Sequence, residues 1–230
     1  QTFRCPQELC DISSRFISRN PAQIAKAVRS STPAIGPVLQ AFQMTRREEV
    51  QDGIRQYLTK LHQQLVSGAV PPRRDGRVRV FVLGRYRADR NAVPADWKTL
   101  FGSTMEVEFL TAHRSKGREA DYVILPGMVN RGFPSLRADD PVLSLAMPDG
   151  DTYPLSEERR LFYVALTRAR RSVAMFTLQG KHSPFLDELV EEGVVEVTGI
   201  SGAAINEERC PVCKVGVFVE RNGPHGAFRS

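Results

Sequence analysis

The sequence predicts an α/β fold built on a mostly parallel sheet with helices on both faces. The first observation is that short apolar segments alternate along the chain with longer segments of helical periodicity, the order typical of strands joined by crossover helices. The second is that segment 77–83 changes from alternation to a continuous apolar run at Val80–Leu83, which indicates a strand covered on both faces.

Residue patterns place the individual elements. Strands are expected at 38–42, 77–83, 106–110, 121–125 and 172–177, and helices at 6–17, 46–67, 94–101, 156–172 and 184–192. Asn20-Pro21 and Ser67-Gly68 are typical of sites where helices end. We expect residues 1–192 to form the main domain, 193–205 a linker and 206–230 a separate small module.

The segment 156–172 is the helix around which we expect the chain to be organised. Ser156 can cap it, and its acidic first turn and basic last turn both suit the helix dipole. Arg159 falls on the polar side, whereas Arg168 projects from the apolar arc. An arginine cannot be buried cheaply without an anionic partner. Two interpretations of Arg168 stay open: an ion pair with an acidic neighbour, or a contact with a phosphate.

Composition narrows the class of protein. The net charge of +6 weakly favours a polyanionic partner, and four cysteines in 230 residues favour a reducing cytoplasm over a secreted disulfide framework. No apolar run approaches the roughly 20 residues that cross a bilayer. The start, Gln1–Arg4, has neither the apolar core of a signal peptide nor an initiator Met. We expect a cytoplasmic fragment of a longer protein, with no membrane partner.

Two polar stretches follow predicted strands, and ligands of open α/β sheets bind at the carboxyl ends of strands. Thr111–Ala120 is dense in hydroxyl, imidazole and cationic donors, which suits contact with a phosphate backbone. The alternative is a solvated polar loop. In Gly84–Arg87, the side chains of Arg85 and Tyr86 are also candidates for contact with nucleic acid.

Three segments together resemble a known family. Thr111–Leu125 resembles motif V of the UvrD/Rep-type superfamily 1 DNA helicases, Glu157–Ala169 resembles their motif VI, and Gln1–Arg4 resembles the end of their motif IV. The resemblance covers about residues 1–192. It implies domain 2A, the second RecA-like lobe of an ATP-dependent helicase. Such helicases step along single-stranded DNA in the 3′-to-5′ direction and separate duplexes, here in DNA repair or recombination in the bacterial cytoplasm and nucleoid.

The resemblance implies nucleotide-binding roles for residues at the matching positions. Arg168 would be the motif VI arginine finger on the γ-phosphate of ATP, and Arg4 the motif IV arginine on the same phosphate. Phe3 replaces the tyrosine that usually stacks on adenine. Glu119 would accept a hydrogen bond from the ribose, next to Gly117 in the same nucleotide site.

The resemblance also implies that Thr111 and His113 contact single-stranded DNA. Arg114 and Arg118 depart from the family pattern, and neither carries a family role. We expect both to add positive charge near the DNA path.

Other parts of such a helicase do not occur in this sequence. It contains no P-loop of the form Gly-x-x-x-x-Gly-Lys-Ser/Thr, and only about 106 residues separate Arg4 from Thr111, so domain 2B would be reduced or absent. We expect the Mg²⁺ ligands in an N-terminal RecA-like lobe and this chain alone to be inactive. Two alternatives stay open: a nuclease-associated motor, and a helicase-like DNA-binding or polymerase-associated remodelling module that does not unwind DNA.

The last segment resembles the first half of a topoisomerase-type zinc ribbon. Cys210 and Cys213 form one Cys-x-x-Cys pair, whereas structural zinc needs four ligands. We therefore expect a truncated zinc-ribbon-like segment with half a metal site, which would bind Zn²⁺ only in a complete ribbon. His225 is expected to lie on the surface.

Overall fold

A six-stranded parallel sheet forms the centre of the structure, with strand order β3-β2-β4-β5-β1-β6. This computed structural model describes residues 5–23, 28–135, 153–205, 218, 220–223 and 226–229. The strands of the sheet are β1 (Leu39–Met44), β2 (Val78–Gly84), β3 (Met105–Thr111), β4 (Ala120–Leu125), β5 (Ala169–Leu178) and β6 (Val197–Thr198). The strand directions define an amino edge and a carboxyl edge of the sheet.

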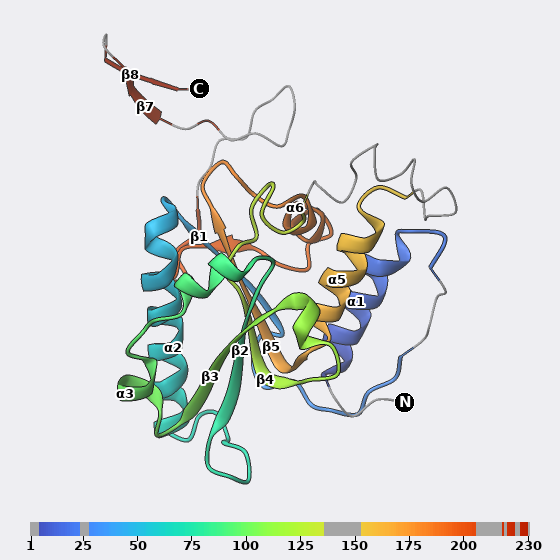
Figure 1. The fold of residues 1–230 in the computed structure, drawn as a ribbon, viewed down its shortest axis with the longest axis vertical. Coiled ribbons are helices and arrows are strands. Elements are labelled where there is room, and N and C mark those ends of the chain that lie inside the picture. The colour runs from blue at the N-terminus through green and yellow to red at the C-terminus, as the bar shows by residue number, and fades with distance from the viewer. Residues whose placement is uncertain are drawn as a thin grey trace.

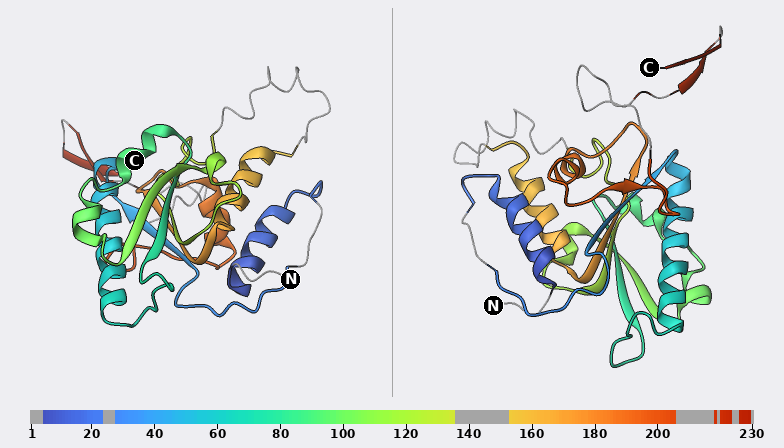
Figure 2. Two further views of the ribbon diagram at one scale, coloured as in Figure 1. Left: turned by 60° about the horizontal axis from the view of Figure 1, so that its bottom comes forward. Right: turned by 180° about the vertical axis from the view of Figure 1, so that it is seen from behind.

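Helices cover both faces of this sheet. They are α1 (Gln7–Ser18), α2 (Val50–Val66), α3 (Trp97–Phe101), α5 (Ser156–Leu166) and α6 (Pro184–Glu191), with the 3₁₀ turns η1 (Arg47–Glu49), η2 (Arg87–Ala92) and η3 (Ala112–Ser115). Helices α1 and α5 lie side by side on one face, and α2 lies on the other (Figures 1 and 2). The predicted α/β fold, of the RecA-like type, is confirmed.

Each face of the sheet packs against its own apolar core. On one face, Phe16 from α1, Phe162 from α5 and Phe185 from α6 form a buried aromatic cluster with ring centroids 4.9–5.5 Å apart. On the other face, Ile54 and Leu58 of α2 are fully buried against the sheet. The β4 strand is buried along its whole length because both cores cover it. This is the burial predicted for central strands of a parallel sheet.

The predicted helix 156–172 is shorter in the structure and ends at Leu166. The hydroxyl of Thr167 donates to the carbonyls of Tyr163 and Val164, which satisfies groups left open by the last turn. The chain then enters β5, where Ala169 pairs with Ala120 of β4. The ladder partners on β4 and β1, which the sequence pattern does not reveal, favour a strand over further helix. Ser156 is the first helical residue and not the cap, since the preceding residue, Leu155, is in the left-handed region with φ 55°.

Arg159, which the sequence places on the polar side of the predicted helix, is buried in the structure. Glu158 and Arg159 are 2% and 4% exposed because α1, α6 and the segment around Ser135 surround α5 on its polar side as well. Arg159 makes two hydrogen bonds, of 2.7 and 2.8 Å, to the carboxylate of Glu188 on α6. Burial of these charges is possible because each has a charged partner.

The C-terminal segments differ in how far the structure describes them. Within the expected linker 193–205, β6 joins the sheet beside β1, so part of this segment belongs to the main domain. Residues 220–229 contain a hairpin of β7 (Glu220–Gly223) and β8 (Gly226–Arg229). Cys210, Cys213 and His225 lie outside the described residues, and the division at 206–230 stays a prediction. None of the helices described is both long enough and apolar enough to span a bilayer.

Candidate nucleotide and DNA interface

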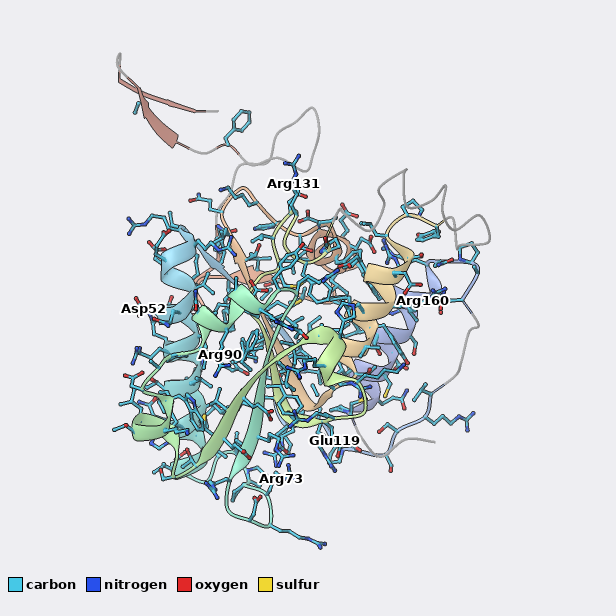
Figure 3. The ribbon with its side chains drawn as sticks, viewed as in Figure 1. Asp52, Arg73, Arg90, Glu119, Arg131 and Arg160 are labelled. Carbon is cyan, nitrogen blue, oxygen red and sulfur yellow. The ribbon has the colours of Figure 1, made fainter. Side chains whose placement is uncertain are left out.

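Motifs V and VI meet at the amino edge of the sheet, where β4 and β5 begin. The amide of Ala120 donates to the carbonyl of Arg168 at 3.0 Å, and this bond joins the two segments just before their strands pair. Arg168 and Glu119 are therefore brought to the same edge, although 49 positions separate them in the sequence. Figure 3 shows Glu119 at this edge.

The Arg168 side chain is held by neutral acceptors around it. Its Nε donates to the carbonyl of Val164 at 3.0 Å, and its Nη1 donates to the carbonyl of Arg118 at 3.0 Å. Nη2 lies 3.4 Å from the hydroxyl of Thr167. Arg168 is 9% exposed, so the helix end and motif V enclose most of the side chain. These bonds fix the direction of the guanidinium, which is the property required of a group that must meet a developing charge.

Glu119 lies next to this arginine in a different environment. Its carboxylate accepts a hydrogen bond of 2.7 Å from Nη1 of Arg170, and the two side chains are 38% and 40% exposed. An ion pair this exposed contributes little to stability, so the carboxylate is accessible to another donor. Gly117 has φ +82° in the turn that precedes Glu119, a conformation that favours glycine.

Phe3 and Arg4 lie outside the described residues, and the described part of the chain begins at Cys5, which follows them in the sequence. Cys5 is buried in the core on the α1 side of the sheet and lies 3.1 Å, Sγ to Sγ, from Cys10. Burial raises the pKa of the nearby Tyr163 hydroxyl, with smaller contributions from both cysteines. The start of α1 therefore packs against α5, the helix that leads into Arg168.

The sequence suggested that the whole stretch 111–120 lies at the carboxyl ends of strands. In the structure, only the first part of the stretch lies there. It leaves β3 at the carboxyl edge and enters β4 at the amino edge, because β3 and β4 both run parallel to β2. Between them, η3 packs against α5, with Ala112 and Ser115 fully buried. One connection thus spans the sheet from Thr111 to Glu119.

The predicted DNA contacts occupy the carboxyl edge. Thr111 is the last residue of β3 and is partly exposed, and His113 in η3 is exposed. Arg118 lies toward the other end of the connection and makes two hydrogen bonds to Glu108, which raise the pKa of its guanidinium. The expectation that Arg118 adds positive charge to a DNA path is therefore weakened, since Glu108 offsets that charge.

Arg85 and Tyr86 also follow the carboxyl end of their strand, but both side chains have protein partners. Arg85 makes three hydrogen bonds of 2.8–3.0 Å to the buried carboxylate of Glu158, and this contact raises the pKa of the arginine. The hydroxyl of Tyr86 donates to Ser135 at 2.8 Å, although the residue is 37% exposed. Arg85 is positioned to link β2 to α5, and Tyr86 keeps an exposed ring surface.

Comparison with known proteins identifies this arrangement. Residues 96–180 match the family model described as UvrD-like helicase C-terminal domain. The chain is also 30% identical over 190 residues to DNA helicase IV of Escherichia coli, a match that covers 82% of this chain and 25% of that protein. The chain carries a UvrD-like helicase C-terminal domain. The matched family region includes both Glu119 and Arg168.

Other relatives of this UvrD-like domain are similar over shorter regions. DNA helicase II of Escherichia coli is 37% identical over 101 residues, covering 40% of this chain and 13% of the relative. A probable DNA helicase of Mycoplasma pneumoniae is 37% identical over 94 residues, covering 38% and 16%. The chain thus spans about a quarter or less of the length of these relatives.

Sequence reasoning missed two residues that organise the UvrD-like domain. Glu158 also accepts a hydrogen bond of 2.9 Å from the amide of Ser135, so one buried carboxylate ties the segment before residue 136 to both β2 and α5. Arg170, beside Arg168, is the partner of Glu119. Glu157 and Glu158 are adjacent acidic residues in the first turn of α5, and this sequence pattern does not indicate that Glu158 is buried.

Gly84, which precedes Arg85 at the end of β2, permits a close approach of neighbouring side chains. A Cβ there would lie 2.5 Å from Cβ of Asp89 and 2.9 Å from the ring of Phe109. We expect Gly84→Ala to lower the free energy of unfolding by about 1–3 kcal/mol because its neighbours must move. Urea unfolding measures this, with Gly127→Ala as control, since a Cβ there meets nothing closer than 3.9 Å. Equal losses in the two variants would contradict the steric explanation.

Proposed function

We propose that this chain is the second RecA-like motor lobe, domain 2A, of an ATP-dependent DNA helicase that moves 3′ to 5′ along single-stranded DNA. The observation that carries the proposal is the meeting of Arg168 and Glu119 at one edge of the sheet, with Thr111 and His113 on the same connection toward the opposite edge. The protein would act in the bacterial cytoplasm on nucleoid DNA, in repair or recombination. Its partners would be single-stranded and duplex DNA and the N-terminal lobe.

The donor set at the amino edge fits a nucleoside triphosphate. Phosphoryl transfer requires compensation of the negative charge on the γ-phosphate, and an arginine supplied from outside the P-loop lobe does this in related reactions. Arg168 would take this role, Arg4 would contact the same phosphate, and Glu119 would accept a hydrogen bond from the ribose. Phe3 would stack on the adenine. The carbonyls of Val164 and Arg118 already orient the Arg168 guanidinium, so less reorganisation is required during the reaction.

The connection 111–120 would couple the state of the bound nucleotide to the contacts with DNA. Its two ends lie at opposite edges of the sheet, and its middle is packed under α5. Closure of a second lobe on Arg168 and Glu119 would therefore displace Thr111 and His113 together with the rest of this lobe. Repeated opening and closing would convert hydrolysis into steps along the strand.

The proposal assigns the binding of metal ions to parts of the protein other than the described residues. Within the described ranges, no group of three or more His, Cys, Asp or Glu residues is arranged to hold a metal ion. We propose that the ligands of Mg²⁺, which would offset phosphate charge, belong to the N-terminal lobe. Zn²⁺ at Cys210 and Cys213 stays a prediction from the sequence.

The proposal is tested by ATP hydrolysis in the longer protein that contains this lobe. We expect hydrolysis to be stimulated by single-stranded DNA, and unwinding to require a 3′ single-stranded tail. His113→Ala is expected to weaken stimulation by raising the DNA concentration needed, with a smaller effect on the rate at saturating DNA. Hydrolysis without any dependence on DNA would contradict the proposal. Binding of DNA without hydrolysis would favour the remodelling module instead.

A further inference from the structure

A cluster of four arginines lies at the amino edge, and one of them, Arg170, also pairs with Glu119 of the proposed motor site. Arg73 and Arg74 come from the turn before β2, and Arg170 and Arg171 from the start of β5. With Asp75 and Asp121 they line a cleft of about 620 Å³. Four arginines against the two aspartates and Glu119, which pairs with Arg170, leave a formal excess of one positive charge. Figure 3 shows Arg73 at the same edge as Glu119.

A buried carboxylate holds part of this arginine cluster in place. Asp121 has a side chain that is 4% exposed, and its Oδ2 accepts a hydrogen bond of 2.9 Å from the amide of Arg79. Nη1 of Arg73 lies 3.7 Å from Oδ2, and Nε of Arg171 lies 3.4 Å from Oδ1. Two guanidinium groups thus share one carboxylate, which keeps like charges close together. A dianionic group in the cleft would relieve that repulsion.

The outer members of the arginine cluster are available to a ligand. Arg74 is exposed and makes no hydrogen bond or ion pair with any residue that the structure describes. The side chain of Arg73 is 35% exposed. Arginine forks match the oxygen geometry of phosphate, so the chemistry of this cleft favours a phosphate group over a single carboxylate.

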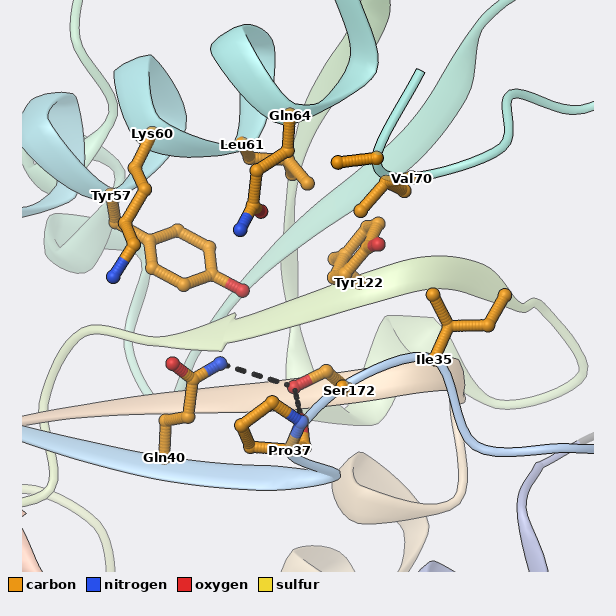
Figure 4. A pocket seen from close by; sticks show the side chains of 12 residues that line it. Ile35, Pro37, Gln40, Tyr57, Lys60, Leu61, Gln64, Val70, Tyr122 and Ser172 are labelled. Atoms are coloured by element: carbon orange, nitrogen blue, oxygen red, sulfur yellow. Dashed lines mark hydrogen bonds between the residues drawn. The ribbon is translucent and has the colours of Figure 1, made fainter. Parts of the chain in front are cut away.

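A second cavity, of about 260 Å³, adjoins the arginine cluster (Figure 4). It lies between α2 and the amino ends of β1, β4 and β5. Ile35 lines both cavities, and Asp121 and Arg171 of the cleft are followed in the chain by Tyr122 and Ser172 of the cavity. The Arg171 guanidinium of the cleft also lies 5.9 Å from the ring centroid of Tyr122 in the cavity, so the two spaces are neighbours.

The walls of this cavity combine apolar surface with hydrogen-bonding groups. Tyr57 and Tyr122 are 7% and 4% exposed and contribute aromatic surface, and burial raises the pKa of the Tyr57 hydroxyl, which therefore stays neutral. The Lys60 ammonium and the Gln64 amide line the cavity, and no side-chain hydrogen bond joins either to the described part of the chain. An amide that can both donate and accept suits the edge of a nucleobase.

We propose that the cleft and the cavity together bind a nucleotide, with its phosphate on the arginine cluster and its base in the cavity beside Gln64. The site does not use Arg168. Its ligand is either a free mononucleotide or one nucleotide of a single strand, since both present the same base and phosphate.

Calorimetric titration of the 230-residue chain tests this proposal. The probes are the four ribonucleoside 5′-monophosphates, the corresponding nucleosides, inorganic pyrophosphate and a short single-stranded oligonucleotide. We expect at least one monophosphate or the oligonucleotide to bind at least tenfold more tightly than the nucleoside and pyrophosphate. Binding of the oligonucleotide alone would assign the site to nucleic acid, and binding of the monophosphate would assign it to a free nucleotide.

Two variants, each with a matched control, locate the binding. R73A/R74A is expected to weaken it about tenfold or more, since a hydrogen bond to a charged group is lost. The control R46A/R47A removes the same charge from exposed arginines that follow the carboxyl end of β1 and should leave affinity unchanged. Gln64→Ala should weaken binding of the monophosphate severalfold, whereas Gln63→Ala, at an exposed neighbouring position outside the cavity, should not.

Several results would overturn the proposal. They are the absence of binding by every probe, equal affinity for pyrophosphate and the nucleotides, and equal losses in R73A/R74A and its control. Arg168→Ala is expected to leave this binding intact, so loss of binding in that variant would also overturn it. Failure here would leave DNA-stimulated hydrolysis by the longer protein unaffected, and failure of the motor proposal would leave the titration unaffected.

Discussion

Arg168→Ala is expected to lower the rate of DNA-stimulated ATP hydrolysis by about 10³-fold or more in the longer protein, the effect typical of a lost arginine finger. The lobe presents this guanidinium at the amino edge, oriented by the carbonyls of Val164 and Arg118. Substitution removes charge compensation needed mainly in the transition state, so ATP binding should be largely kept. Steady-state hydrolysis and equilibrium binding of a non-hydrolysed analogue measure the two effects.

Two further variants separate a role in hydrolysis from a role in folding. Arg168→Lys keeps the charge but loses the planar fork, so we expect hydrolysis to stay strongly impaired with normal thermal stability. Arg160→Ala removes an arginine from the same helix, where its side chain is 41% exposed, and should change hydrolysis little. An unchanged rate in Arg168→Ala would mean that the residue is structural and that the motor assignment of this edge is wrong.

Arg159→Ala is expected to lower the free energy of unfolding by about 3–5 kcal/mol, because it removes the closer of two arginines that pair with the carboxylate of Glu188, the other being Arg19 at 3.1 Å. The Arg159 guanidinium makes two hydrogen bonds to that carboxylate and one of 3.1 Å to the carbonyl of Phe16. It also stacks over the Phe16 ring, 4.4 Å from the centroid, so substitution removes packing as well as charge. Urea unfolding of the 230-residue chain followed by circular dichroism measures the loss.

The double variant Arg159→Met/Glu188→Leu tests the cause of that loss. Replacing both charges by apolar groups of similar size is expected to restore much of the stability, since no buried charge is then left unpaired. The Nε of Arg159 already lacks a hydrogen-bond partner within the described structure, which adds to the cost of keeping the arginine. A double variant as unstable as Arg159→Ala would show that packing, and not charge pairing, dominates at this site.

The sequence by itself predicted the order of the main elements and named candidate site residues, whose roles stay predictions. Strands β2, β3 and β4 lie within one residue of their predicted positions, because continuous or alternating apolar runs between turn residues are local signals. The unusual position of Arg168 on an apolar arc was also visible, because helical periodicity makes a misplaced charge stand out. Together with the motif resemblance, these signals were enough to identify the UvrD-like domain.

Tertiary structure alone decided where these residues meet and which charges are buried. The end of α5 at Leu166 depends on ladder partners in β4 and β1, which a local pattern does not contain. The parallel direction of β3 and β4 places Thr111 and Glu119 at opposite edges, although they belong to one polar stretch. Glu158 is buried because Arg85, 73 positions away, supplies the opposite charge. A single side chain's environment is set by such distant neighbours, whereas its local conformation is set largely by adjacent residues.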